Sequence, residues 1–368
     1  MSDIDVSTLS VPSFEKLIRE DLQDFMPYAS ARSEKLDGEL WLNANECPWD
    51  ASETGLLWNR YPEQQPEAII NALATRYKVK SNQVLVTRGS DEGIDLLVRL
   101  FCRYQQDGVF ACAPTFGMYK ICAKIQGVKY DEYSLTADAD FKLDVERFIQ
   151  AIPESCKLVF LCSPNNPTGK IISENDIEEI VEALQHRCVL VVDEAYIEFA
   201  NAQSATVLLE KYDNLVVLKT LSKAYGLAGV RVGILISNMD LVQWLKKILP
   251  PYPVPKPCTE AILASFDPSN ILQVESRVQV IILEREKLFL EIEKLEVVEK
   301  IWASQGNYLL VKFKQDIFEM CLEQGIALRN MKKIFGGNEV IRISIGLPEE
   351  NKILLEMLTL VNMAYETV

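Results

Sequence analysis

Four short polar segments hold the side chains of this chain that could do chemistry. The turn 88–91 (Arg-Gly-Ser-Asp) opens a helical pattern, and its free backbone N–H groups could hold a phosphate. The segment 163–169 (Ser-Pro-Asn-Asn-Pro-Thr-Gly) is too polar and too rich in proline to continue a strand or a helix. Asp193 and Tyr196 bring a carboxylate and a phenol together, and the segment 220–231 contributes Lys223, an amine able to form a covalent bond.

Each of these segments alone also has an ordinary structural explanation. An acid at the end of a strand is often a helix cap, and a single lysine is usually a solvated surface charge. The four segments are informative together because each directly follows a short apolar run rich in β-branched residues. In an open parallel sheet the carboxyl ends of the strands meet at one edge, where ligands bind. We therefore expect the four segments to form one site.

The hydrophobic pattern predicts the elements that must position this site. Helical periodicity is clearest over 92–104, 174–186 and 271–295. It alternates with continuous apolar runs typical of a mainly parallel sheet covered on both faces, at 84–87, 109–112, 158–162, 189–192, 215–218 and 230–236. After the long helix, 308–313 and 340–345 alternate like strands of a smaller sheet. The prediction is an α/β fold, with a large domain at 45–265 and a small α+β domain at 266–368.

The two ends of the large domain carry weaker signals. Residues 13–25 have the pattern of one amphipathic helix, which is too small to fold alone. We therefore expect residues 1–44 to form an arm that packs on the small domain or on a partner subunit. Five prolines between 250 and 257 predict irregular backbone before the long helix.

The composition excludes several classes of function. With 38 basic and 53 acidic side chains, the net charge of -15 would repel nucleic acid and anionic lipid. The acidic amino terminus is unlike a secretory signal, and the apolar runs stop short of the roughly 18 residues that a membrane span needs, so a soluble, cytoplasmic protein is predicted. Nine cysteines without a Cys-x-x-Cys pair indicate reduced packing residues. With His186 as the one histidine, no metal site is expected.

The order and flanking residues of Asn166, Asp193, Lys223 and Arg231 resemble those of the fold-type I aminotransferases. The resemblance runs from about residue 40 to 345 and implies a mainly parallel seven-stranded sheet in the large domain, with pyridoxal 5′-phosphate as cofactor. It implies that Lys223 forms a Schiff base with the cofactor aldehyde. Asp193 would keep the pyridine nitrogen protonated, so that the ring accepts electrons from the substrate Cα. Lys223, Asp193 and Tyr196 are the expected catalytic residues.

The same resemblance implies the remaining cofactor contacts. Asn166 and Tyr196 would each donate a hydrogen bond to the phenolate oxygen of the ring, and Phe116 would stack on it. The phosphate would be shared by several donors, with Arg231 as a planar charged fork; the expected set is Gly89, Ser90, Asp91, Thr220, Ser222 and Arg231.

Motifs outside this set resemble the histidinol-phosphate aminotransferase family; they lie at 27–32, 42–48, 60–62, 325–329 and 342–346. The resemblance implies that Arg342 binds the carboxylate of glutamate or 2-oxoglutarate, and that Tyr28 and Arg329 meet the phosphate of histidinol phosphate. Asn45 would lie near the substrate. Tyr61 would reach the cofactor phosphate of the neighbouring subunit, so a homodimer is expected. The family usually has Asn-Glu-Asn-Pro where this chain has Asn-Ala-Asn-Glu-Cys-Pro at 43–48, which leaves the choice of substrate more open.

The expected reaction is a ping-pong transamination in L-histidine biosynthesis. L-histidinol phosphate and 2-oxoglutarate would give imidazole acetol phosphate and L-glutamate, with Lys223 making both proton transfers. An aromatic amino acid aminotransferase or a phosphothreonine decarboxylase of the same fold would use the same cofactor residues. A non-catalytic ligand-binding protein on this scaffold is an alternative from another class, although it would not need the lysine.

Overall fold

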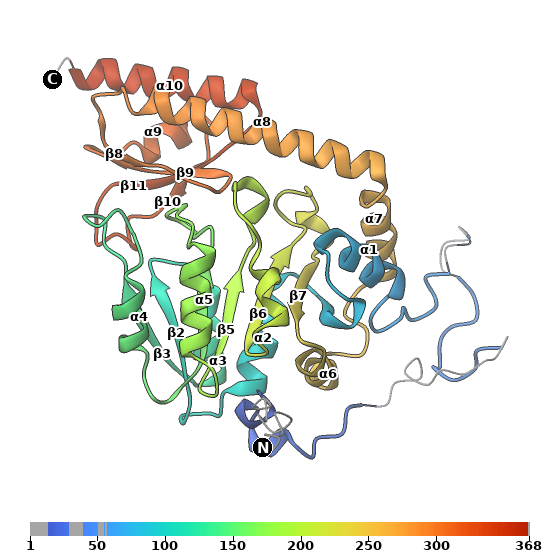
Figure 1. Cartoon of the computed structure of the whole chain (residues 1–368). Helices are drawn as coiled ribbons and strands as arrows, with labels where there is room; N and C mark the ends of the chain where they lie inside the picture. The colour runs from blue at the N-terminus through green and yellow to red at the C-terminus, as the bar shows by residue number, and fades with distance from the viewer. Residues whose placement is uncertain (1–13, 29–39, 51–54, 56, 367–368) are drawn as a thin grey trace, which may run out of the picture.

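The computed structural model describes residues 14–28, 40–50, 55 and 57–366. A large seven-stranded sheet with helices on both faces lies below a smaller α+β part, and the long helix α8 (Pro268–Ile292) runs from one to the other (Figure 1). Pro268 stands in the first turn of α8, where its missing N–H is not needed. The predicted α/β fold with a mainly parallel seven-stranded sheet is confirmed.

The large sheet is parallel except at one strand. Its order is β1-β7-β6-β5-β4-β2-β3, and β7 runs antiparallel to both of its neighbours. The strands are β1 (Val84–Thr87), β2 (Gly108–Ala113), β3 (Lys129–Ser134), β4 (Cys156–Cys162), β5 (Val189–Asp193), β6 (Leu215–Thr220) and β7 (Gly233–Ser237). Every residue of β1, β5, β6 and β7 is buried, which explains their unbroken apolar runs. The polar strand β3 lies at the edge of the sheet, where solvent tolerates its lysine and acids, and the apolar pattern therefore missed it.

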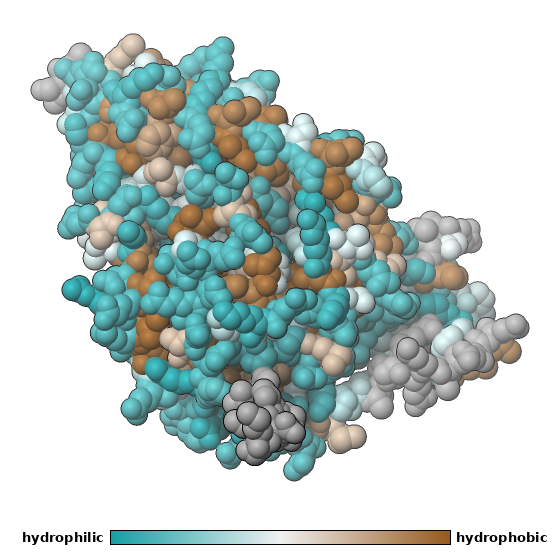
Figure 2. Space-filling view, viewed as in Figure 1, coloured by the Kyte–Doolittle hydropathy of each residue, from teal (hydrophilic) through white to brown (hydrophobic). Residues whose placement is uncertain are grey.

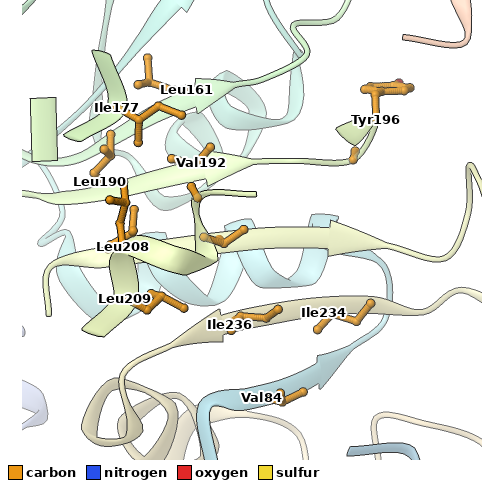
Figure 3. Packing of buried hydrophobic residues seen from close by; sticks show 14 of the residues in the cluster. Val84, Leu161, Ile177, Leu190, Val192, Tyr196, Leu208, Leu209, Ile234 and Ile236 are labelled. Atoms are coloured by element: carbon orange, nitrogen blue, oxygen red, sulfur yellow. The ribbon is translucent and has the colours of Figure 1, made fainter. Parts of the chain in front are cut away.

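Alternate residues of these strands point into two cores. Val192, Ile234 and Ile236 point to the face covered by α1 (Glu67–Tyr77), α5 (Glu174–Ala183) and α7 (Lys256–Ser265). Figure 3 shows this packing, with Tyr196 beyond the end of β5. The opposite face is covered by α2 (Ser90–Phe101), α3 (Met118–Gln126) and α6 (Met239–Ile248). A further helix, α4 (Val145–Ala151), packs against α5.

A second, antiparallel sheet has the order β10-β11-β9-β8; the part of the structure built on it is here called the small domain, and the part built on the seven-stranded sheet the large domain. Its strands are β8 (Val298–Trp302), β9 (Tyr308–Phe313), β10 (Arg329–Asn330) and β11 (Val340–Ser344). The helices α8 and α10 (Pro348–Glu366) share one apolar cluster with β9 and β11, and α9 (Phe318–Glu323) contributes Cys321 to it. The two alternating segments predicted as strands are β9 and β11.

The amino-terminal segment differs from its prediction. Residues 14–25 form two short 3-10 turns, Phe14–Leu17 and Glu20–Leu22, and not one helix. The side chains of Phe14, Leu17 and Ile18 are buried in the apolar cluster of α2 and α6, and the backbone N–H of Arg19 donates to the Leu100 carbonyl at 3.1 Å. This stretch of the arm therefore packs on the large domain and not on the small one, because its apolar side chains complete the cover of the large sheet. Residues 1–13 and 29–39 of the expected arm lie outside the described residues.

One face of the protein surface is mostly polar, with apolar side chains in small separate groups (Figure 2). Among the described residues, no helix is both long enough and apolar enough to span a membrane.

Candidate active site

A pocket opens at the carboxyl ends of β4, β5 and β6, beside the first turn of α2. About 610 Å³ of empty space lies within it and its open mouth. It is lined by Gly89, Ser90, Asp91, Phe116, Cys162, Asn166, Asp193, Ala195, Tyr196, Thr220, Ser222, Lys223, Ala228 and Arg231. All the residues expected to hold the cofactor are in this set except Tyr61. The four polar segments that follow the strands thus line one pocket.

A buried carboxylate forms the floor of the pocket. Asp193, the last residue of β5, is only 2% exposed. Its Oδ1 accepts a hydrogen bond from the backbone N–H of Ala195 at 3.1 Å, and its Oδ2 accepts one from the Tyr119 hydroxyl at 2.7 Å. Burial raises the pKa of Asp193 to about 6, because the charged form loses its hydration. The Asp193 carboxylate could therefore act as the counter-charge for a protonated nitrogen of a bound ligand.

The lysine lies just beyond the end of β6. The turn that carries Lys223 is held by two hydrogen bonds, from Ser222 N to Thr220 Oγ1 at 3.1 Å and from Gly226 N to the Lys223 carbonyl at 3.2 Å. Its Nζ lies 5.7 Å from the centroid of the Tyr196 ring and is open to the pocket. Burial of part of the side chain, followed by the positive charges of Arg342 and Arg231, lowers the pKa of Lys223. The neutral amine, which is the nucleophile and the base, is thereby more abundant.

A hydrogen-bond chain joins the small domain to this pocket. Arg342 of β11 donates from its NH1 to Asn166 Oδ1 at 2.5 Å, and Asn166 Nδ2 donates to the Tyr196 hydroxyl at 3.3 Å. Burial raises the pKa of Tyr196, so its phenol stays protonated at neutral pH. The guanidinium of Arg342 also lies over the Tyr308 ring, 5.5 Å from its centroid.

The phosphate end of the pocket depends on two glycines. At Gly89 (φ +77°), which precedes α2, an added Cβ would lie 2.6 Å from NH2 of Arg231. At Gly233 an added Cβ would lie 2.2 Å from the carbonyl carbon of Gly89, so glycine lets β7 pass close behind the turn. The Arg231 guanidinium lies across the start of α2, 3.4 Å from the carboxylate of Asp91. Free N–H groups, a helix amino terminus and an arginine fork fit a phosphate group.

Three residues that the sequence analysis did not assign hold the site together. Asn165 ties two loops, since its Oδ1 accepts from Thr115 at 2.8 Å and its Nδ2 donates to the Pro114 carbonyl at 2.9 Å. Tyr308 of β9 donates to the Asn165 carbonyl at 2.6 Å and packs edge-on against Tyr196. Tyr119 donates to Asp193. Tyr119 and Tyr308 reach partners that are 74 and 143 residues away along the chain, and no local sequence pattern indicates such contacts.

None of the expected substrate or partner residues lines this pocket: Arg342 reaches it through Asn166, and the four others lie apart from it. Tyr61 is 49% exposed and stacks on Tyr252 with 4.4 Å between ring centroids. Together with Asn45 it lines a separate hollow near Pro255. Tyr28 is 75% exposed, and Arg329 is exposed on β10, opposite Arg342 in the strand register. One chain therefore assembles the cofactor residues and Arg342 but does not bring these four side chains to Lys223.

Comparison with known proteins agrees with this geometry. The family model of aminotransferase class I and II matches residues 39–358. The chain is 49% identical over 353 residues to a histidinol-phosphate aminotransferase of Francisella philomiragia, covering 96% of this chain and 97% of that one.

Solved structures of low sequence identity share the fold. One is the histidinol-phosphate aminotransferase of Clostridium acetobutylicum, with a TM-score of 0.75, 20% identity and coverage of 83% of this chain and 91% of that one. Another is the Sinorhizobium meliloti histidinol-phosphate aminotransferase in complex with pyridoxal-5′-phosphate, with a TM-score of 0.73, 22% identity and coverage of 83% and 84%. By its sequence and its architecture, the chain belongs to the histidinol-phosphate aminotransferase family, pyridoxal-phosphate-dependent enzymes of aminotransferase class I and II.

Proposed function

We propose that this chain transfers the amino group of L-histidinol phosphate to 2-oxoglutarate, giving imidazole acetol phosphate and L-glutamate in L-histidine biosynthesis. The observation that carries the proposal is that a lysine of lowered pKa and a buried carboxylate line one pocket, next to a turn suited to a phosphate. A relative 49% identical over nearly the whole chain bears the name of this activity. A biosynthetic enzyme of this kind would work in the cytoplasm.

The residues present fit pyridoxal phosphate. Lys223 would hold it covalently, Asp193 would neutralise its ring nitrogen, and the turn at Gly89 with Arg231 would bind its phosphate. Phe116 would pack on the ring, and Asn166 and Tyr196 would donate to its phenolate oxygen. When bound, the cofactor serves as the sink for electrons released at the substrate Cα.

Lys223 is the residue that we assign to the proton transfer. Lys223 Nζ takes the proton from the substrate Cα, for which the lowered pKa of its ammonium is suited. The same Nζ would hold that proton inside the pocket and deliver it to the bound cofactor, so the transfer needs no histidine. Asp193 stays charged at neutral pH because a pKa of about 6 lies below that value.

Arg342 is the side chain that we assign to the substrate carboxylate. Its guanidinium offers a planar pair of donors, which matches the carboxylate of glutamate or 2-oxoglutarate. The Asn166 contact at 2.5 Å and the Tyr308 ring hold it in place. L-histidinol phosphate has no carboxylate, and its phosphate would use Tyr28 and Arg329 instead.

The second half of the substrate site would come from a partner subunit. Tyr61, Asn45 and Tyr28 are exposed and lie outside the Lys223 pocket, so they have no role there within one chain. A homodimer in which Tyr61 of the partner subunit reaches the cofactor phosphate would give these side chains a function.

The test is the absorption spectrum of the purified protein with pyridoxal phosphate, before and after L-histidinol phosphate is added without a keto acid. Conversion of the lysine-bound cofactor band to that of the aminated cofactor is the expected result. A stable lysine-bound band would refute this donor and leave the family; no such band at all would refute the cofactor assignment. Release of carbon dioxide would identify a decarboxylase, and turnover of aromatic amino acids alone would identify the aromatic aminotransferase.

A further inference from the structure

Behind the pocket floor lies a tyrosine that the proposed mechanism does not use. Tyr119 stands in the first turn of α3 and is fully buried. Its ring stacks on Phe160, with 4.6 Å between centroids and 13° between planes, and it meets the Phe116 ring edge-on at 5.8 Å. The ring is thus held on two sides, which fixes the direction of its hydroxyl.

That hydroxyl has one strong partner. It donates to Asp193 Oδ2 at 2.7 Å, a short distance expected when the acceptor is charged. The backbone N–H of Ala195 holds the other oxygen at 3.1 Å, so the two donors together fix the plane of the carboxylate. Asp193 lines the pocket and Tyr119 does not, which means that the phenol reaches a bound group only through Asp193.

Two opposing effects act on the Asp193 carboxyl. Burial raises its pKa to about 6, and the hydrogen bonds from Tyr119 and Ala195 oppose that rise. Tyr119 has its own pKa raised by burial and by the Asp193 charge, so it remains a protonated donor at neutral pH. Loss of the phenol would move the carboxyl towards its neutral form.

We propose that Tyr119 is a positioning residue, which keeps Asp193 charged and oriented towards the ring nitrogen of the cofactor. The inference rests on the proposed function, because it takes Asp193 as the partner of that nitrogen. Through its edge contact with Phe116, the same ring also braces the side chain assigned to the cofactor face. One buried phenol thereby supports both the charge and the packing of the site.

The experiment is equilibrium binding of pyridoxal phosphate to the apoprotein between pH 5 and 8.5, for the wild type and Tyr119→Phe. The variant keeps the ring and removes the donor. At pH 7 we expect binding to weaken about tenfold to a hundredfold, as for loss of a hydrogen bond to a charged group. The midpoint below which binding is lost should rise by about one pH unit. The matched control is Tyr212→Phe, which removes another buried phenol, one whose hydroxyl contacts Glu178 at 3.2 Å; it should change neither quantity.

A double-mutant cycle separates this role from general packing. In an Asp193→Asn background, Tyr119→Phe should weaken binding by less than twofold, because the charge through which it acts is gone. An equal loss in both backgrounds, or an unchanged midpoint in Tyr119→Phe, would overturn the inference while wild-type binding upholds the cofactor assignment. A wild-type protein that binds no pyridoxal phosphate at any pH would overturn both.

Discussion

Arg342 of the small domain donates to Asn166 of the large domain across 2.5 Å, and Asn166 in turn donates to Tyr196 at 3.3 Å. The arginine assigned to the substrate carboxylate is therefore in contact with the pair assigned to the cofactor oxygen. Arg342 Nε is buried without a hydrogen-bond partner among the described residues. A carboxylate ligand with two oxygens would satisfy a donor of this kind, because an unpaired buried N–H is costly.

Arg342→Lys should separate the two half-reactions. The variant keeps a positive charge but loses the planar fork, so the single-turnover rate constant with glutamate should fall about tenfold to a hundredfold relative to the wild type. The half-reaction with histidinol phosphate, which has no carboxylate, should change by less. Rapid-mixing absorbance measurements of each half-reaction provide the test. Equal losses in both would argue that Arg342 acts on the cofactor site alone.

Lys223→Ala should remove both the covalent link and the base. We expect turnover to fall by at least the roughly 10² to 10⁴ that general acid–base catalysis contributes. Lys129→Ala, on the exposed edge strand β3, is the control for loss of a lysine and should retain wild-type turnover. Steady-state rates with both substrates decide the matter, and substantial turnover in Lys223→Ala would remove that residue from the mechanism.

Asp193 should lower the free energy of unfolding of the apoprotein at pH 7 relative to its value near pH 4. Its folded-state pKa of about 6 lies above the ordinary aspartate value of 3.8, so the folded state binds the proton more tightly. Stability from this group is then present at low pH and is lost as pH rises from about 4 through 6. Asp193→Asn should therefore raise the free energy of unfolding at pH 7 by about 1–3 kcal/mol, with the gain vanishing near pH 4. Urea unfolding of both apoproteins across this range tests the sign. A variant that is less stable at pH 7 would contradict it.

A buried ion pair beneath the site should matter for stability. Lys219 and Glu194 are each 2% exposed and lie 2.6 Å apart, one residue before Thr220 and one after Asp193. Lys219→Met should reduce the free energy of unfolding by about 3–5 kcal/mol, since it leaves Glu194 charged and buried. The double variant Lys219→Met/Glu194→Gln should recover part of this loss. Urea titration of the four proteins is the measurement, and additive losses would show that the two charges do not stabilise each other.

The sequence predicted the large sheet and the meeting of four polar segments in one pocket, because both depend on local patterns. Buried parallel strands need unbroken apolar runs, and their polar ends mark the site. The edge strand β3 was not predicted because its sequence is polar. The two turns at 14–22 were not predicted because packing on α2 stabilises them. Asp193 was found from its place after β5, but Tyr119 was not assigned to it. That contact depends on how α3 lies over the sheet, which no local pattern states.

The place of Tyr61 can be tested by mixing two inactive proteins. If Tyr61 of the partner subunit completes the Lys223 pocket, each site takes Lys223 from one subunit and Tyr61 from the other. Lys223→Ala and Tyr61→Ala then each inactivate the site by removing a residue that comes from a different subunit. A mixed dimer then has one site with Lys223 from one chain and Tyr61 from the other, both intact. Random exchange makes half of the dimers mixed, so about a quarter of wild-type activity should return. Each variant mixed with itself provides the control. If mixing restores no activity although subunits exchange, Tyr61 either serves its own chain or has no part in the site, and its stacking on Tyr252 would be the whole of its role.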